Sequence, residues 1–537
     1  LTAWRVFGLF ATDLGLGPDE AQYWRWAQSL EWGYFSKPPL IAWLIAGATS
    51  MFGDAEWAIR LPAPFLHMVT ALLVGVIGQR LFDVRTGALA AAYYGLMPGV
   101  TLGSAVMTTD TLLLPIWASG LLALIMLRDR CHDWRIGLWL GLSIGAGVLA
   151  KYAMIYFLIG LGIVALFDPR TRAALASRSG AIAGLMASTM VAPHILWNLS
   201  NDFQTIAHTA DNAKWGGPLF HPEHALTFLS DQMAIVGPIG LVVLIGVLPG
   251  IASRLKQPMD KAEAALAWLA AFAFPAFLIV LGQAITSRAH ANWAATAYVS
   301  GAIIIAAVLA KPNKVPVWAW VASAGLVAVG ALAAPDMGLA GRATVGGSLA
   351  TLILLIGAIS RWQRPGIYTV GMVINAVGAV VFSIMAIAPL SWSEAMNLGD
   401  SLKRARAWPE TVERLSEAVE THGAQILVVD EREVWHGIDY YGRDGFPVAV
   451  RSWRVGSGPR SFAEQRPIPE GDAGPVLIAS VRPGHRSAME ADFEEWVFLE
   501  EIRLPIGGGA ERRISVYLAH NFTPLDRTEA WAERFGK

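Results

Sequence analysis

The stretch AEAALAWLAAFAFPAFLIVLGQA, residues 262–284, decides the fold class of this chain. Its one charged residue, Glu263, lies at its start, and everything that follows is apolar or neutral. A helix of about 20 such residues crosses the hydrocarbon core of a bilayer. The stretch therefore predicts a membrane-spanning helix.

The composition agrees with a membrane protein. The chain has 537 residues, of which 54% are hydrophobic and only 15% are charged, whereas about 25% are charged in soluble domains. The net charge of −1 excludes the strong field that nucleic-acid binding requires. Cys131 is the single cysteine, which excludes an internal disulfide and a multi-cysteine metal site.

Similar apolar stretches recur to about residue 390. They lie near 57–80, 86–105, 110–127, 135–150, 152–167, 179–198, 232–251, 262–284, 292–310, 315–334, 345–360 and 367–390. LTAWRVFGLFA at residues 1–11 is too short to cross a bilayer and lacks the basic start of a signal peptide, so we expect a first span trimmed at its start. Together these stretches predict a bundle of about 13 spans.

Lys and Arg mark every second loop, which predicts that these loops face the cytoplasm. Basic residues flank the loops near residues 80–85, 128–135, 170–178, 254–261, 311–314 and 361–364. The alternate loops then face outward: 13–56, 106–109, 199–231, 285–291 and 335–344.

The composition changes near residue 396. VERLSEAVETHG at 412–423 is typical of an amphipathic helix that ends at Gly423, and AQILVVD, GPVLIAS and RRISVYLAH are typical of strands. The sequence thus predicts two domains: a mainly α membrane domain over 1–395, and an α/β domain over 396–537 that the parity of the spans places outside the cytoplasm.

The first outward loop, 13–56, holds the most distinctive polar pattern. GLGPDEAQYWRWAQSL places Pro18 at a helix start with Asp19 and Glu20 in the first turn. PPLIAWLIAGATSMFG predicts a second short helix, and we expect both to lie in the membrane interface. Asp19 is a candidate general base that takes a proton from an acceptor. Stabilisation of the helix start by the two acids is the alternative.

The same loop contains GYFSKPPLIAWL at 33–44, in which Lys37 precedes two prolines. The prolines stiffen the backbone that carries the ammonium group. A cation at such a position can stabilise a leaving phosphate. The alternative is a lysine that snorkels to the interface.

Four further motifs place polar residues at outward helix ends. MTTDTLLLPIW contains Asp110, LAKYAMIY contains Lys151, VAPHILWNLSNDFQ contains Trp197 and Asn198, and TSRAHANWAATAY contains Arg288 and Asn292. A charge such as Lys151 near the bilayer is a functional candidate by default. Helix caps, interfacial anchors and ordinary loop side chains are the alternatives for each of them.

These motifs, in this order, resemble the bacterial GT-C membrane glycosyltransferases related to protein O-mannosyltransferases and to the lipid A aminoarabinose transferase. The resemblance covers roughly residues 13 to 310. It implies a helical membrane domain and a donor sugar on a polyprenyl phosphate.

The resemblance also implies residue roles. Asp19 resembles the proposed general base, Glu20 its companion, and Asp110 the second acidic motif. Lys37 resembles the lysine that faces the donor phosphate, with Lys151 and Arg288 at basic positions near it. Weaker candidates for contacts with the acceptor or sugar are Tyr23, Trp197, Asn198 and Asn292.

One position departs from the aminoarabinose transferase pattern, in which a glutamate that can join a metal site often precedes the lysine. Here that residue is Ser36, so we expect no metal there. His208, His221 and His224 match no standard metal spacing and are interpreted as solvated loop residues. We expect no required cofactor, and the need for a divalent metal stays open.

The hypothesis is an inverting glycosyltransferase that moves a hexose or pentose from a polyprenyl-phosphate donor to an envelope acceptor, lipid A, another glycolipid or a protein. The expected place is the outer face of the bacterial inner membrane. No phosphate-binding glycine motif supports a nucleotide-sugar donor. The alternatives are a flippase for a lipid-linked sugar and a non-catalytic scaffold. The sugar, the acceptor and the oligomeric state stay open.

Overall fold

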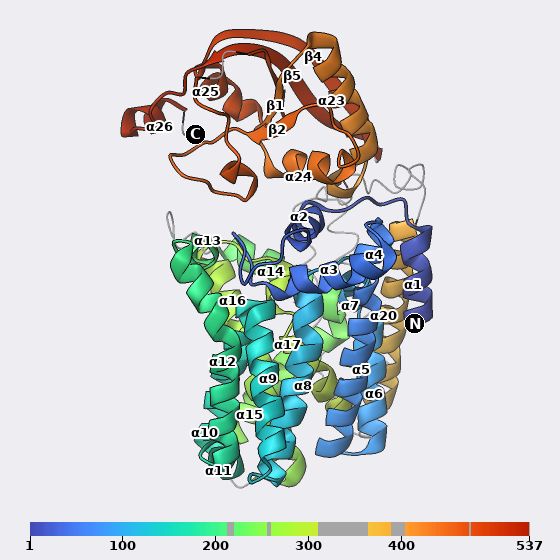
Figure 1. Cartoon of the computed structure of the whole chain (residues 1–537). Coiled ribbons are helices and arrows are strands. Elements are labelled where there is room, and N and C mark those ends of the chain that lie inside the picture. The colour runs from blue at the N-terminus through green and yellow to red at the C-terminus, as the bar shows by residue number, and fades with distance from the viewer. Residues whose placement is uncertain are drawn as a thin grey trace. The chain divides into compact units, whose positions relative to one another are not determined.

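The computed structural model describes residues 1–211, 220–254, 259–309, 364–387, 403–471, 474–507 and 509–535. These residues form two compact units (Figure 1). The first, the membrane unit, comprises Leu1–Leu9, Lys37–Ile41 and Arg60–Ile384, and the second, the polar unit, comprises Phe10–Ser36, Ala42–Ile59 and Met385–Lys537. The predicted boundary near residue 396 stays a prediction, and parts of the first outward loop belong to the polar unit.

The membrane unit is built of helices. Those wholly within it are α5 (Pro62–Leu81), α6 (Val84–Leu96), α7 (Pro98–Gly103), α8 (Thr109–Asp129), α9 (Trp134–Ala150), α10 (Ile155–Phe167), α11 (Pro169–Leu175), α12 (Arg178–Ser200), α13 (Gln204–Asp211), α14 (Pro222–Val236), α15 (Pro238–Arg254), α16 (Lys261–Thr286) and α17 (Ala297–Leu309). Short 3₁₀ turns, η1 (Tyr152–Met154) and η2 (Ala291–Ala294), precede α10 and α17. Four helices contain residues of both units: α1 (Thr2–Ala11), α3 (Leu40–Phe52), α4 (Glu56–Arg60) and α20 (Arg364–Ile387).

By length and composition, five of the described helices can cross a membrane: Glu56–Leu81, Thr109–Asp129, Arg178–Ser200, Lys261–Thr286 and Gly366–Ser383. The pair α14 and α15, bent by 115°, makes a sixth if it is one span. The predicted spans near 315–334 and 345–360, with the outward loop 335–344, lie outside the described residues. The number of about 13 spans therefore stays a prediction.

Two predicted spans are interrupted where the backbone demands it. The stretch near 86–105 divides at Met97, because Pro98 has no N–H with which to continue α6. The stretch near 232–251 divides at Gly237, whose φ of +85° favours glycine. The break that the sequence indicates at Lys151 is confirmed, since α9 ends at Ala150 and Lys151 is extended.

Helices α9 and α12 pack closely through glycines spaced four residues apart. A Cβ atom at Gly137 would lie 2.2 Å from the carbonyl oxygen of Ser179, and one at Gly141 would lie 2.5 Å from that of Ala183. A Cβ atom at Gly145 would lie 2.8 Å from the Cβ atom of Met190. Small residues at this spacing let two membrane helices approach closely.

The polar unit contains helix α2 (Pro18–Ala27) and an α/β fold (Figure 1). Its five-stranded sheet has the order β2–β1–β3–β5–β4, in which β2, β1 and β3 are parallel and β5 is antiparallel to β3 and β4. The strands are β1 (Ile426–Val429), β2 (Ala449–Ser452), β3 (Val476–Ser480), β4 (Phe493–Gly507) and β5 (Ala510–Phe522). The helices are α23 (Trp408–His422), α24 (Arg432–Tyr441), α25 (Arg486–Glu490) and α26 (Glu529–Phe535), with 3₁₀ turns η3 (Lys403–Ala405), η4 (Ala463–Gln465) and η5 (Pro483–His485).

The predicted helix that ends at Gly423 and the three predicted strands are confirmed as α23, β1, β3 and β5. One core, under α23 and α24, contains Trp408, Leu415 and Leu427. A second core on the other sheet face contains Val428 and Ile478. Strands buried on both faces are typical of a parallel sheet covered by helices.

Candidate active site

Three residues that the sequence singled out separately meet in the membrane unit. Lys151 Nζ lies 2.6 Å from Oδ1 and 2.8 Å from Oδ2 of Asp110. The side-chain amide of Asn292 donates to Asp110 Oδ2 at 2.6 Å. The Asp110 and Lys151 side chains are only 10% and 17% exposed, so this is a nearly buried ion pair with an additional amide donor.

Local structure explains how Asp110 and Lys151 are placed. Thr108 caps α8 by accepting a hydrogen bond from the backbone N–H of Thr111 at 3.2 Å, which puts Asp110 in the first turn. Lys151 is the extended residue between α9 and η1. A helix cap, one of the alternative interpretations of this motif, is therefore present, and the same helix start presents a carboxylate to a lysine from 41 residues further along the chain.

Lys37 and Arg288 also belong to the membrane unit. Lys37 is half-buried just before α3, and Arg288 is exposed between α16 and η2. Their predicted contacts with a donor phosphate stay predictions. The charge of Lys151 is neutralised by Asp110.

Asp19 and Glu20, the two acids of the first outward loop, make different contacts within the polar unit. Glu20 is 4% exposed, and its Oε2 accepts from the backbone N–H of Gly17 at 3.0 Å, which caps α2. The Asp19 side chain is 58% exposed and pairs with Arg432. Helix capping thus accounts for Glu20, while Asp19 keeps an accessible carboxylate.

Arg432 was not singled out from the sequence. Its Nη2 donates to Asp19 Oδ1 at 3.0 Å and its Nη1 donates to Gln22 Oε1 at 3.1 Å. Although burial acts to lower the pKa of Arg432, the Asp19 carboxylate raises it. A signal existed: Arg432 follows the end of β1, and residues at the carboxyl ends of parallel strands often serve binding sites.

The weaker candidates for sugar contacts are mostly engaged elsewhere. Tyr23 is buried beside Trp26, with ring centroids 5.6 Å apart. Asn198 is buried, and its amide donates to the carbonyl oxygen of His194 on the same helix at 3.0 Å. Trp197 is half-buried. The sugar-binding roles of these residues stay predictions.

One group among the described residues offers three donors to a metal ion. The donor atoms of His221, Glu223 and His224 lie within 4.8 Å of one another. The sequence predicted that the two histidines are solvated loop residues and did not single out Glu223, whose Oε1 lies 3.0 Å from His221 Nδ1. His208 lies apart from this group in α13.

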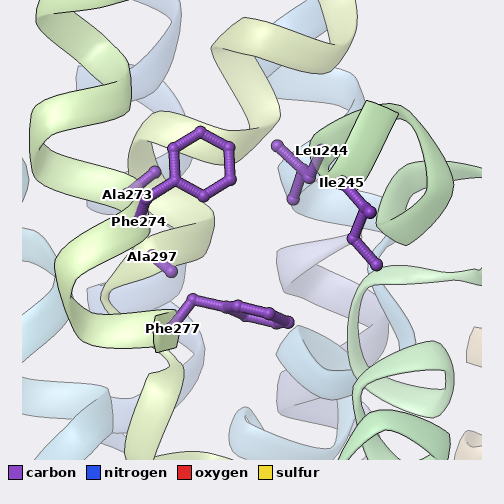
Figure 2. Close-up of a pocket in the computed structure, with 6 residues that line it drawn as sticks. All are labelled: Leu244, Ile245, Ala273, Phe274, Phe277 and Ala297. Carbon is purple, nitrogen blue, oxygen red and sulfur yellow. The ribbon is translucent and has the colours of Figure 1, made fainter. Parts of the chain in front are cut away.

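An apolar pocket of the membrane unit lies between α15, α16 and α17 (Figure 2). It is lined by Leu244, Ile245, Ala273, Phe274, Phe277 and Ala297. No polar side chain takes part in this lining, and the space is about that of one water molecule.

Comparison with known proteins agrees with the predicted resemblance. Residues 36–197 match the family model of dolichyl-phosphate-mannose-protein mannosyltransferases, a segment that contains Lys37, Asp110 and Lys151. The chain is 36% identical over 304 residues to the lipid A galacturonosyltransferase RgtD of Rhizobium johnstonii, which is 56% of this chain and 62% of that protein.

A second relative is the undecaprenyl phosphate-α-4-amino-4-deoxy-L-arabinose arabinosyl transferase 2 of Pseudomonas fluorescens, 28% identical over 248 residues, 42% of this chain and 41% of that protein. A third is the lipopolysaccharide core galacturonosyltransferase RgtA of Rhizobium johnstonii, 27% identical over 237 residues, 42% of this chain and 46% of that protein. The chain matches less than two thirds of the length of each of these relatives.

Among solved structures, ArnT from Cupriavidus metallidurans bound to undecaprenyl phosphate superposes with a TM-score of 0.61 over 96% of both chains, at 14% identity. This likeness shows the fold. The resemblance to GT-C membrane glycosyltransferases is thus confirmed, and the chain is a mainly helical membrane protein with a small sheet.

Proposed function

We propose that this protein is an inverting glycosyltransferase that moves a sugar from a polyprenyl-phosphate donor to lipid A or a related envelope glycolipid. The observation that carries the proposal is the 36% identity over 304 residues with a lipid A galacturonosyltransferase. The same relative favours a hexuronic acid, such as galacturonic acid, over a pentose as the sugar. The proposed place is the outer face of the inner membrane.

In the proposed reaction, an acceptor hydroxyl attacks the anomeric carbon of the donor sugar. The Asp19 carboxylate takes the hydroxyl proton, the new C–O bond forms with inversion, and the bond from the anomeric carbon to the phosphate oxygen breaks. The polyprenyl phosphate leaves with additional negative charge, which the Lys37 ammonium stabilises. Arg288 is a second candidate cation for this phosphate.

We assign a different task to the pair of Asp110 and Lys151. Both groups are nearly buried, and the Asp110 carboxylate also accepts a hydrogen bond from Asn292, so the two side chains are held in place. We therefore assign them to the lining of the donor site. Because Lys151 is part of a neutral pair, its electrostatic attraction to the phosphate is weaker than that of a single cation.

The test is transfer by the purified protein from polyprenyl-phosphate galacturonic acid to lipid A, read by mass spectrometry. We expect a mass increase of one hexuronic acid with the wild type, and loss of turnover in Asp19→Asn and Lys37→Ala. The matched controls are Asp129→Asn and Lys261→Ala, which change exposed residues outside the proposed site. Full turnover in either site variant contradicts the assigned role of that residue.

One observation favours the alternative of a flippase for the lipid-linked sugar, the break of 115° between α14 and α15. Transporters often place such broken helices at their binding sites. The experiment separates the two functions, because a flippase moves the donor across a vesicle bilayer without altering the mass of lipid A.

A further inference from the structure

The C-terminal part of the chain packs against α2 within the polar unit (Figure 1). Helix α24 makes most of this contact. Tyr441 Oη accepts from the backbone N–H of Leu16 at 2.7 Å, and Tyr440 stacks edge-on against Trp24 with ring centroids 4.9 Å apart. The start of α2 is therefore held by a helix more than 400 residues away in sequence.

Arg432 is the first residue of α24, and its guanidinium group spans two positions of α2. It donates to Asp19 at 3.0 Å and to Gln22 at 3.1 Å. Residues three positions apart lie on the same helix face, so one planar group reaches both. The Gln22 amide donates in turn to Ser36 Oγ at 3.4 Å, and Ser36 directly precedes Lys37 in the chain.

This network does little for the stability of the fold. The Asp19 and Arg432 side chains are 58% and 34% exposed, and ion pairs this exposed to solvent contribute little to the free energy of unfolding. What two donors to one helix face do is restrict the rotamers of the carboxylate and favour its charged form. Both effects matter for a general base, and Tyr440 and Tyr441 provide separate contacts between α24 and the α2 region.

We propose that Arg432 is a positioning residue, with which the C-terminal domain orients the Asp19 carboxylate and keeps it ionised. The inference rests on the proposed function, in which Asp19 takes the acceptor proton. Through Gln22 and Ser36 the same network ends at the residue before the candidate phosphate-binding lysine. The C-terminal part of the chain accordingly takes part in the proposed reaction through Arg432.

The pH dependence follows from the charges around the pair. The titratable or charged groups that act on Arg432 and its neighbour His436 are, besides Asp19, Tyr23, Glu431, Arg25 and Arg466. Arg432 is a cation in direct contact with Asp19. Its removal therefore shifts the acid limb of the rate profile to higher pH, because the carboxylate loses the group that favours its charged form.

The experiment compares Arg432→Gln and Arg432→Lys with the control Arg414→Gln in the full-length protein. Arg414 forms a similarly exposed pair with Glu500 in the same domain. For Arg432→Gln we expect a loss in kcat of about 10-fold to 100-fold with little change in KM for the donor, since small misplacements of reacting groups cost this much. Arg432→Lys restores the acid limb to lower pH but only part of kcat, because lysine supplies charge without the two-pronged geometry.

A second readout is hydrogen exchange of the full-length protein in detergent. We expect faster exchange in α2 and in residues 28–36 for Arg432→Gln, and wild-type exchange for Arg414→Gln. If Arg432→Gln retains the kcat, the pH profile and the exchange rates of the wild type, the inference is wrong while the proposed function stands. If the wild type transfers no sugar from a polyprenyl phosphate, the proposed function fails and the positioning role falls with it.

Discussion

The ion pair of Asp110 and Lys151 allows a prediction with a magnitude. Its shortest N–O distance is 2.6 Å, which corresponds to an attraction of about 6 kcal/mol at an effective dielectric constant of about 20. Loss of one partner from a buried pair typically costs about 3–5 kcal/mol, because the other charge is left uncompensated. Removal of both partners costs much less, since no uncompensated charge remains.

The two single variants are not expected to be equal. In Asp110→Asn the Lys151 ammonium loses the carboxylate that neutralises it, so the loss lies near the upper end, about 5 kcal/mol. In Lys151→Met the carboxylate keeps the hydrogen bond from Asn292, so the loss lies near the lower end, about 3 kcal/mol. The double variant is expected to lose no more than the milder single variant, which gives a coupling energy of several kcal/mol.

The assay is reversible unfolding in mixed micelles of SDS and a mild detergent, followed by circular dichroism for the wild type, both single variants and the double variant. The control cycle uses the exposed pair of Arg414 and Glu500, for which the coupling energy is expected to stay below about 1 kcal/mol. Additive losses in the Asp110 and Lys151 cycle would refute the reasoning, because they would mean that the two charges do not depend on each other.

The same variants separate structural from catalytic roles. If the pair also serves the reaction, the double variant keeps most of the free energy of unfolding but transfers no sugar. If the pair only supports the fold, the double variant regains transfer together with stability. A stable and active double variant would contradict its assignment to the donor site.

Three further predictions follow from other features. Gly141→Val is expected to lower the free energy of unfolding by about 1–3 kcal/mol in the same micelle assay, because its Cβ would meet the backbone of α12. At Gly162 nothing lies within 4 Å of an added Cβ, so Gly162→Val is expected to change the free energy of unfolding little. Burial lowers the pKa of His436 well below its ordinary value. As the pH falls below about 6.5, His436 is therefore protonated in the unfolded state but not in the folded state. The free energy of unfolding falls in that range by about 1.4 kcal/mol per pH unit. Unfolding of His436→Leu between pH 7 and 5 is expected to lack this part of the slope, while the control His422→Leu, at an exposed site, keeps it. Chelation of metal ions with EDTA is expected to leave sugar transfer intact. If EDTA abolishes transfer, and Zn²⁺ restores it in the wild type but not in His221→Ala, the group of two histidines and a glutamate is functional.

The sequence predicts local features of this chain well. The start of α2 at Pro18 and the end of α23 at Gly423 each depend on a residue whose backbone chemistry is decisive at that position. Strands β1 and β3 are short apolar runs with turn residues on both sides, so they are also visible. These features need no knowledge of the rest of the fold.

Two strands are missed for physical reasons. β2 (Ala449–Ser452) has only four residues, too few for a periodic pattern. β4 (Phe493–Gly507) lies at the edge of the sheet and carries Glu494, Glu495 and Glu500. Charges on an edge strand prevent unwanted pairing with other chains, and here they also hide the alternation that identifies a strand.

Pairings between distant residues could not be predicted, because each charged residue has a sufficient local explanation. Asp110 and Lys151 are 41 residues apart, and Asp19 and Arg432 are 413 apart. In a sequence, Asp19 in a first helical turn is satisfied by the helix dipole alone. Only the folded chain shows which of these charges has also acquired a partner.

Local and functional explanations of these acids are therefore not exclusive. Thr108 caps α8, and this cap puts the carboxylate of Asp110 in a first turn, within reach of Lys151. Glu20 caps α2, which leaves the neighbouring Asp19 accessible to solvent and to Arg432. A helix start fixes the backbone of the residue next to the cap, and it favours the charged form of a carboxylate there. The feature that makes helix stabilisation a sufficient account of Asp19 and Asp110 is thus the same feature that suits them to a reaction.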